Sequence, residues 1–320
     1  MDVQFRELGS SGIKVSTVAM GCWPIAGMTS LNVNTEDSLK TLYAAFDSGI
    51  NFFDTAHCYG LDGGSEKLVG KLMEGRQDQV VVATKCGVHW DGQGEKVVDG
   101  SASRIRWECE ESLRRLKIES IDLMYLHRPD PSTPINESAA ALRELQVAGK
   151  VKAVGLSNAS LHEIQKFHSV CPLVAIQPPF NFLQPQTIEP IRPWCMQNDV
   201  SVVNYWPLMK GLLAGKIRRN YQFDPADKRL TYPIFQGDCF ESAQVVLDRL
   251  EPIAESLSIS ISQLVIAWTI GQACITSTLC GAKRDWQIQE TARAMSVQLD
   301  DDVIQVMDRI AAEYSLSISK

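Results

Sequence analysis

The sequence predicts an α/β fold in one domain covering residues 1–320, a (β/α)8 TIM barrel. Eight short apolar runs recur along the chain, and they are continuous rather than alternating, as is typical of strands buried on both faces of a parallel sheet. Amphipathic helical stretches separate the runs without a break in composition. An open doubly wound sheet is the weaker alternative, because no Gly-x-Gly-x-x-Gly follows any run.

The expected elements follow in chain order. The strands are 15–21, 50–54, 80–85, 121–127, 151–158, 173–177, 200–205 and 274–281. The helices are 35–48, 101–116, 136–148, 160–168, 187–197, 261–270 and 286–295. Asn34 or Thr35 is expected to cap the first helix and Asn136 the third. Two segments interrupt the alternation: a long loop over 216–240, of the kind that often serves binding, and an extra helix over 301–314 that we expect on the outside or end of the barrel.

Composition narrows the function classes. The hydrophobic fraction of 45% and the net charge of −7 indicate a globular protein and argue against a nucleic-acid partner. The charged N-terminus lacks a signal peptide pattern, so we expect a cytoplasmic location. The uncharged stretch 256–282 is interrupted by Gly271 and Gln272, so we expect a helix and a strand there and no membrane span. The nine cysteines have no metal-binding spacing, which favours buried reduced thiols and no metal. The oligomeric state is not predicted.

Polar residues stand where the apolar runs end, which is where this fold places its active site. Each has an ordinary explanation by itself, as a helix cap, a solvated lysine or a wall histidine. Their recurrence at seven successive strand ends indicates a functional site. The residues are Asp54, Lys85, His127, Ser157 with Asn158, Gln177, Tyr205, and the group Gly281, Ala282, Lys283 and Arg284.

Several of these segments resemble the signature blocks of the aldo-keto reductase superfamily, in its bacterial NADPH-dependent type. The blocks are GINFFDTAHCYG, VVVATK, IDLMYLH, VGLSN and the Tyr-x-Pro-Leu of NYWPLMKGLLAGK, and they occur in family order between about Leu8 and Met295. The resemblance implies a barrel that reduces an aldehyde, a ketone or an open-chain sugar without a Rossmann domain or a metal. It implies NADPH/NADP+ as the cofactor, with NADH less favoured.

The resemblance implies a catalytic tetrad of Asp54, Tyr59, Lys85 and His127. Hydride addition to a carbonyl builds negative charge on its oxygen, so Tyr59 is expected to donate a proton there. A free phenol has a pKa of about 10, and we expect the Lys85 ammonium to lower it. Asp54 would hold Lys85, and His127 would orient the carbonyl or share in proton transfer.

The resemblance also implies the cofactor contacts. The nicotinamide end would lie against Gly21, Trp23, Asp54, Ser157, Asn158, Gln177 and the stacked ring of Tyr205. The pyrophosphate would lie on Trp206, Pro207, Leu208, Gly211 and the backbone as far as Leu212, together with Lys216. The adenosine end would contact Gly281, Ala282, Lys283, Arg284, Gln287 and Glu290. Lys283 and Arg284 would suit a 2′-phosphate, although they could equally be surface cations that open a helix.

Four residues depart from the family pattern, and they affect the cofactor site rather than the tetrad: Trp206, Cys280, Thr291 and Phe180. Substrate contacts are expected from Trp23, Tyr59, Trp90 and His127, and further aromatic walls from Phe182, Tyr232 and Phe235. The segment RLTYPIFQG is expected to close over cofactor or substrate.

Three alternative functions remain open on the sequence. The first is a nucleotide-sensing regulatory subunit with little turnover, because a fold does not fix a function. The second is a sugar or alcohol dehydrogenase that runs in the oxidative direction. The third is a different barrel enzyme, such as a metal-dependent isomerase or hydrolase, which the lack of a carboxylate and histidine metal set at the strand ends disfavours.

Overall fold

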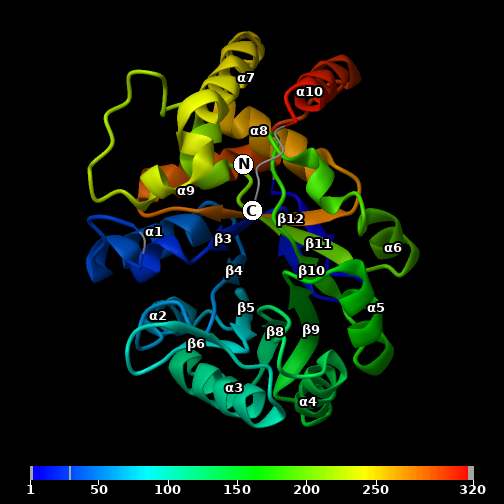
Figure 1. Cartoon of the computed structure of the whole chain (residues 1–320). Coiled ribbons are helices and arrows are strands. Elements are labelled where there is room, and N and C mark those ends of the chain that lie inside the picture. The colour runs from blue at the N-terminus through cyan, green and yellow to red at the C-terminus, as the bar shows by residue number, and fades with distance from the viewer. Residues whose placement is uncertain (1–2, 29, 316–320) are drawn as a thin grey trace.

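The computed structural model describes residues 3–28 and 30–315. In this part of the chain, eight parallel strands close into a barrel, in which each strand pairs with the next and the last pairs with the first (Figure 1). They are β3 (Val18–Gly21), β4 (Phe52–Asp54), β5 (Val81–Cys86), β8 (Ile121–Leu126), β9 (Val151–Ser157), β10 (Ala175–Gln177), β11 (Ser201–Tyr205) and β12 (Ile275–Gly281). The fold prediction is confirmed.

The first expected strand, 15–21, is two strands. Its start is β2 (Lys14–Ser16), which pairs antiparallel with β1 (Phe5–Glu7), and only β3 enters the barrel. Leu8 and Val15 of this hairpin pack against the side chains inside the barrel, so the hairpin closes the barrel's N-terminal end. A second antiparallel pair that the sequence did not indicate, β6 (Val88–Trp90) with β7 (Lys96–Val98), follows β5.

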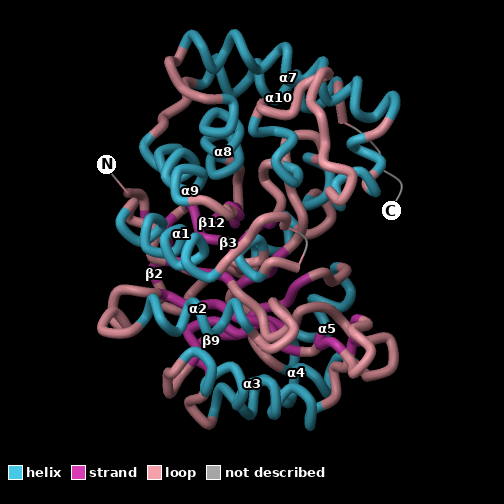
Figure 2. The backbone as a smooth tube through the Cα atoms, turned by 90° about the vertical axis from the view of Figure 1, so that its left-hand side faces the viewer, coloured by secondary structure: helices cyan, strands magenta, loops and turns pink. Residues whose placement is uncertain are grey.

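Eight helices within the described residues follow the barrel strands and form its outer layer (Figures 1 and 2). They are α1 (Thr35–Asp47), α2 (Gly64–Met73), α3 (Ala102–Leu116), α4 (Ile135–Val147), α5 (Leu161–Val170), α6 (Arg192–Gln197), α8 (Ile261–Gly271) and α9 (Asp285–Ala292). The Asn34 side chain accepts a hydrogen bond from the Asp37 amide at 2.9 Å, which confirms it as the cap of α1.

Two helix predictions need correction. Asn136 is not a cap, because α4 already begins at Ile135 and its N-cap residue is Pro134. The expected helix 187–197 is a 3-10 turn, Pro185–Ile188, followed by the short α6. Pro190 and Pro193 lack the backbone N–H that a continuous helix needs, so they divide the segment.

The long loop 216–240 holds two short 3-10 turns, Lys228–Thr231 and Pro233–Phe235, and leads into α7 (Gly237–Ser256). α7 packs outside α8, and α10 (Asp301–Glu313) lies beside α7, as Figures 1 and 2 show. The Trp268 indole of α8 donates to Asp308 of α10 at 2.8 Å. The extra C-terminal helix is therefore outside the barrel, as predicted.

The barrel interior holds an apolar cluster that combines large side chains, among them Phe52 and the fully buried Tyr125, with several alanines. Gly155 faces the Tyr125 ring, and a β-carbon there would overlap it, so a larger residue at this strand position would have to displace the ring. All nine cysteines lie in the described part of the chain as free thiols, and seven of them are buried, as predicted.

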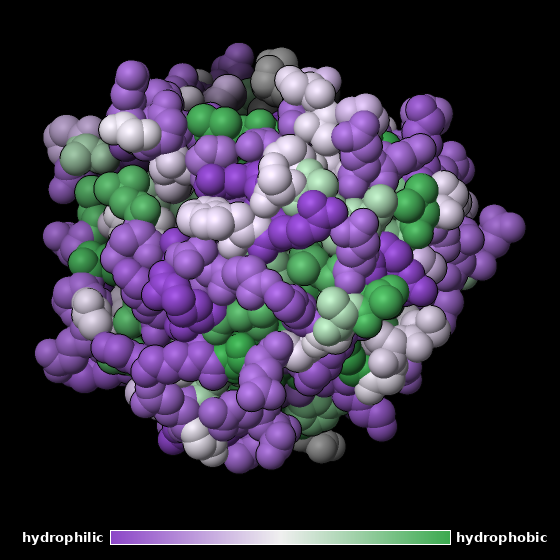
Figure 3. Space-filling model, turned by 90° about the horizontal axis from the view of Figure 1, so that it is seen from below, coloured by the Kyte–Doolittle hydropathy of each residue, from purple (hydrophilic) through white to green (hydrophobic). Residues whose placement is uncertain are grey.

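The face in Figure 3 is mostly hydrophilic, with hydrophobic side chains in small separate groups. No single described helix is long and apolar enough to span a membrane; α7 and α8 pass that test only as a pair bent by 92°.

Candidate active site

The four residues of the expected tetrad meet at one end of the barrel. Asp54 ends β4, Lys85 lies in β5, Tyr59 follows β4 and His127 follows β8. Lys85 Nζ donates to Asp54 Oδ1 at 2.5 Å, to the Thr55 carbonyl at 2.7 Å and to Tyr59 Oη at 3.3 Å. These three bonds use all three ammonium protons and fix the amine under the phenol. The Tyr59 and His127 rings lie edge to face with centroids 6.0 Å apart.

Burial dominates the electrostatics of this group. It raises the pKa of the Asp54 carboxyl, although the hydrogen bonds from Lys85 and Gln177 oppose the change. It also raises the pKa of Tyr59 well above its ordinary value, with Asp54 adding to the effect. The expected lowering of the Tyr59 pKa by Lys85 is therefore wrong for the protein alone, because desolvation of the phenolate outweighs the nearby ammonium. Tyr59 is accordingly a neutral phenol that can donate a proton.

His127 is held in its neutral form. Burial lowers the pKa of its imidazole well below the ordinary value, and the Lys85 ammonium acts in the same direction. The Asn158 amide donates to the His127 carbonyl at 3.0 Å, which ties the backbone of this residue to the end of β9. A neutral imidazole beside Tyr59 can donate one N–H bond to a substrate oxygen without carrying charge.

The residues expected around the nicotinamide form a connected set at the ends of β9, β10 and β11. Tyr205 Oη donates to Asn158 Oδ1 at 2.7 Å, and Asn158 Nδ2 donates to Ser157 Oγ at 2.9 Å. Gln177 Nε2 donates to Asp54 Oδ2 at 2.8 Å, so this amide is linked to the tetrad itself. Hydroxyl and amide groups of this kind both donate and accept, which fits a carboxamide.

The loop after β11 contains three non-glycine residues in the left-handed backbone conformation. Trp206, Met209 and Lys210 have φ values of 61°, 41° and 54°, a conformation that non-glycine residues rarely adopt. Successive turns of this hand can direct backbone N–H groups toward one anion. The Trp206 side chain is 40% exposed, and Lys210 Nζ lies 3.8 Å from its ring centroid and 3.9 Å from that of Tyr232. Sequence reasoning included the Lys210 backbone but missed its side chain, which joins this loop to the 216–240 insert.

The structure brings together the residues expected at the adenosine end. Lys216 pairs with Glu290 at 2.9 Å, and Gln287 Oε1 accepts from the backbone amides of Lys283 and Arg284. Arg284 already pairs with Asp37 at 3.2 Å. Gly281 faces Pro24, which would lie 2.8 Å from an added β-carbon, so its small size serves close packing of the barrel rim. The departures Cys280 and Thr291 are both buried, and Thr291 Oγ1 donates to the carbonyls of Gln287 and Ile288, both at 3.2 Å.

The aromatic residues expected as substrate walls divide into two groups. Trp23 contacts Tyr59 with ring centroids 4.9 Å apart, and the Trp90 indole donates to the Cys58 carbonyl at 2.7 Å, so both adjoin the tetrad. Phe182 does not: it is buried against Trp268 of α8, with ring centroids 4.9 Å apart. The segment after β10 turns this side chain into the layer between barrel and helices.

Phe235 is also buried, against Phe223 at 5.7 Å between ring centroids, and it serves the packing of the insert. Tyr232 lies beside Lys210 in the same insert. The expectation that Phe182 and Phe235 form substrate walls is therefore wrong, because sequence position alone did not show which way these side chains point.

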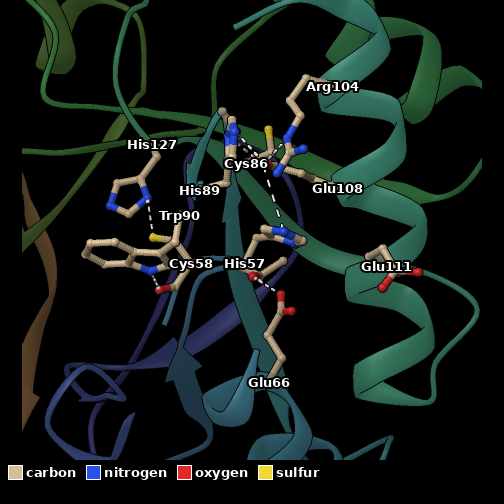
Figure 4. A network of polar contacts seen from close by, with 12 residues as sticks. His57, Cys58, Glu66, Cys86, His89, Trp90, Arg104, Glu108, Glu111 and His127 are labelled. Atoms are coloured by element: carbon tan, nitrogen blue, oxygen red, sulfur yellow. Dashed lines mark hydrogen bonds and ion pairs between the residues drawn. The ribbon is translucent and has the colours of Figure 1, made fainter. Parts of the chain in front are cut away.

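A buried ionic cluster adjoins the tetrad loop and was not predicted (Figure 4). Glu108 accepts from Arg104 Nε at 2.7 Å and from the Gly87 amide at 2.6 Å, and burial raises its pKa to about 7. Arg115 Nη1 donates to Glu66 at 3.0 Å and contacts His57 Nδ1 at 3.1 Å. No group of three or more His, Cys, Asp or Glu side chains among the described residues could hold a metal ion. Nothing in the spacing of α2 and α3 signals this cluster.

Comparison with known proteins agrees with this geometry. The sequence model of the aldo/keto reductase family matches residues 17–312. The chain is 34% identical to aldo-keto reductase YhdN of Bacillus subtilis (strain 168), over 90% of this chain and 87% of the relative. It is 32% identical to the NADH-specific methylglyoxal reductase of Escherichia coli (strain K12), over 95% and 97%. A glycerol dehydrogenase structure from Gluconobacter oxydans superposes with a TM-score of 0.90 at 35% identity, covering 98% of this chain and 96% of that one.

The fold and the site thus define an oxidoreductase barrel of the kind that uses nicotinamide cofactors. The chain belongs to the aldo/keto reductase family.

Proposed function

We propose that the protein transfers a hydride between NADPH and the carbonyl group of an aldehyde, a ketone or an open-chain sugar. The observation that carries this proposal is the contact of Lys85 with both Asp54 and Tyr59 beside a neutral His127. The bound nicotinamide would supply the hydride. Ser157, Asn158, Gln177 and Tyr205 would hold its ring, the loop from Trp206 to Lys216 the pyrophosphate, and residues 281–290 the adenosine.

The tetrad residues would manage the charge that develops on the substrate oxygen. Tyr59 donates its phenolic proton to that oxygen, and the Lys85 ammonium stabilises the phenolate that remains. Asp54 holds Lys85 in place through the bond to its Oδ1. His127 donates an imidazole N–H to the same oxygen and orients the carbonyl. In the reverse direction, the Tyr59 phenolate takes the proton of an alcohol.

The preference for NADPH rests on Lys283 and Arg284. Arg284 is paired with Asp37 and Lys283 Nζ donates to the Leu31 carbonyl at 3.4 Å, so a 2′-phosphate would replace one ion pair and one long bond to a neutral oxygen with two charge-assisted bonds. Arg284→Ser is expected to weaken NADPH binding about tenfold or more and to leave NADH binding within about twofold. An equal loss for both nucleotides would refute the preference.

The oxidative direction is a second candidate. One relative at 35% identity is a glycerol dehydrogenase, and the same groups serve an alcohol substrate. Trp23 and Trp90 beside the tetrad favour a small substrate with an apolar part in either direction.

The decisive experiment is a fluorescence titration with NADPH and NADH, followed by loss of nicotinamide absorbance on adding a panel of aldehydes, ketones and sugars. The reverse assay supplies NADP+ with the corresponding alcohols. Tyr59→Phe is expected to bind nucleotide normally and to lose about 10²- to 10⁴-fold in turnover. Nucleotide binding with no turnover on any substrate would favour a sensing subunit instead, and no nucleotide binding would overturn the proposal.

A further inference from the structure

The Cys58 side chain lies between His127 of the tetrad and His57 of the buried ionic cluster, as Figure 4 shows. Its Sγ is 3.6 Å from His127 Nδ1, within hydrogen-bonding distance for sulfur. Cys58 is only 3% exposed. The contact links Tyr59's immediate neighbour in the sequence to the imidazole expected to bind the carbonyl.

The backbone around Cys58 is held on both sides. Arg115 Nη1 donates to the His57 carbonyl at 3.2 Å and is itself paired with the buried Glu66. The Trp90 indole donates to the Cys58 carbonyl at 2.7 Å. These bonds fix the direction of the Cys58 side chain, so its contact with His127 belongs to the rigid part of the site.

The protonation states allow the thiol to donate to the ring in this contact. Burial raises the pKa of the Cys58 thiol to about 12, so the sulfur carries its proton. His127 is neutral, because burial and Lys85 lower the pKa of its imidazole. A neutral imidazole has one protonated and one bare nitrogen. A thiol S–H that donates to Nδ1 requires Nδ1 to be bare and therefore places the ring proton on Nε2.

We propose that Cys58 is a positioning residue that fixes His127 as the Nε2–H tautomer and so presents a donor to the substrate oxygen. The catalytic consequence rests on the proposed function, whereas the tautomer itself does not. Without the thiol, nothing in this contact would disfavour a proton on Nδ1, and the ring would then offer Nε2 as a bare nitrogen that repels a carbonyl oxygen.

The test uses two substitutions with opposite expectations. Cys58→Ser keeps a donor but is smaller, and Cys58→Val fills the space without a donor. If the hydrogen bond matters, Ser should retain kcat/KM within about threefold and Val should lose about tenfold, mainly in kcat. If Cys58 only fills space, Val should be the better tolerated variant, and the proposal is overturned.

Nitrogen-15 NMR of histidine-labelled protein reads the tautomer without any turnover. The chain has five histidines, and His127→Gln identifies the signals of His127. Long-range proton–nitrogen correlations are expected to show a bare Nδ1 in the wild type and in Cys58→Ser, and a protonated or mixed Nδ1 in Cys58→Val. A protonated Nδ1 in the wild type, or an unchanged ring in Cys58→Val, would overturn the proposal. A wild type with the expected tautomer but no carbonyl turnover would instead count against the proposed function alone.

Discussion

Glu108 gives a prediction about how stability depends on pH. Its side chain is fully buried, and burial raises its pKa from 4.5 to about 7 although Arg104 opposes the change. Between these values the folded protein holds a proton that the unfolded chain has lost. The free energy of unfolding therefore falls as the pH rises through this window. In Glu108→Gln this contribution disappears.

The magnitude follows from the two pKa values. A shift of about 2.5 corresponds to about 3.4 kcal/mol in total, of which about 2.5 kcal/mol falls between pH 5 and pH 8. His57 acts in the opposite direction, because burial lowers its pKa from 6.5 to about 3. Its contribution raises stability by about 2 kcal/mol over the same range. The contributions of Glu108 and His57 to the free energy of unfolding nearly cancel in the wild type. Because Glu108→Gln removes only the first, the stability of the variant should rise by about 2.5 kcal/mol relative to that of the wild type from pH 5 to pH 8.

The assay is urea unfolding of the wild type and Glu108→Gln at pH 5, 6, 7 and 8, under conditions where unfolding is two-state. Loss of a hydrogen bond in the variant would lower its free energy of unfolding by the same amount at every pH. It would therefore not alter how that free energy changes with pH. Glu119→Gln, at an exposed position just after α3, is the matched control and should run parallel to the wild type. Parallel curves for Glu108→Gln would refute the reasoning, because they would mean that the ion pair with Arg104 keeps Glu108 charged throughout.

Two further substitutions test the packing described above. Phe182→Ala should cost about 3–5 kcal/mol of stability, because the ring is buried against Trp268. The KM for a carbonyl substrate should change less than about threefold. A large KM change without loss of stability would mean that Phe182 does line the substrate site. Gly155→Ala should cost about 1–3 kcal/mol, because its β-carbon would overlap the Tyr125 ring, and an unchanged melting temperature would contradict the close packing.

The sequence predicted the barrel and the polar residues that meet at its rim. Continuous apolar runs separated by helical stretches define a parallel sheet, and the closed β3-to-β12 barrel agrees. Because all parallel strands point the same way, polar residues at their ends must meet at one rim. Asp54 and Lys85 were therefore predictable as neighbours from the ends of two runs, and they bond at 2.5 Å.

Helix boundaries were predictable where the signal was local. The Asn34 cap depends on one side chain and one backbone amide three residues later, which the sequence contains. The division of 187–197 depends on Pro190 and Pro193, whose effect the apolar spacing concealed. The hairpin that takes residues 14–16 away from the first barrel strand depends on a pairing partner, Phe5–Glu7, that has no apolar run.

Only the tertiary structure decided the protonation of the site. The family resemblance implied that Lys85 would lie near Tyr59, and proximity to an ammonium alone predicts a lowered phenol pKa. The structure buries the phenol, and burial raises its pKa. Likewise, only the folded chain brings Cys58 to His127 and Glu108 to Arg104. Desolvation and side-chain direction depend on every neighbour in space, whereas the pattern along the chain records only which residues can reach the barrel rim.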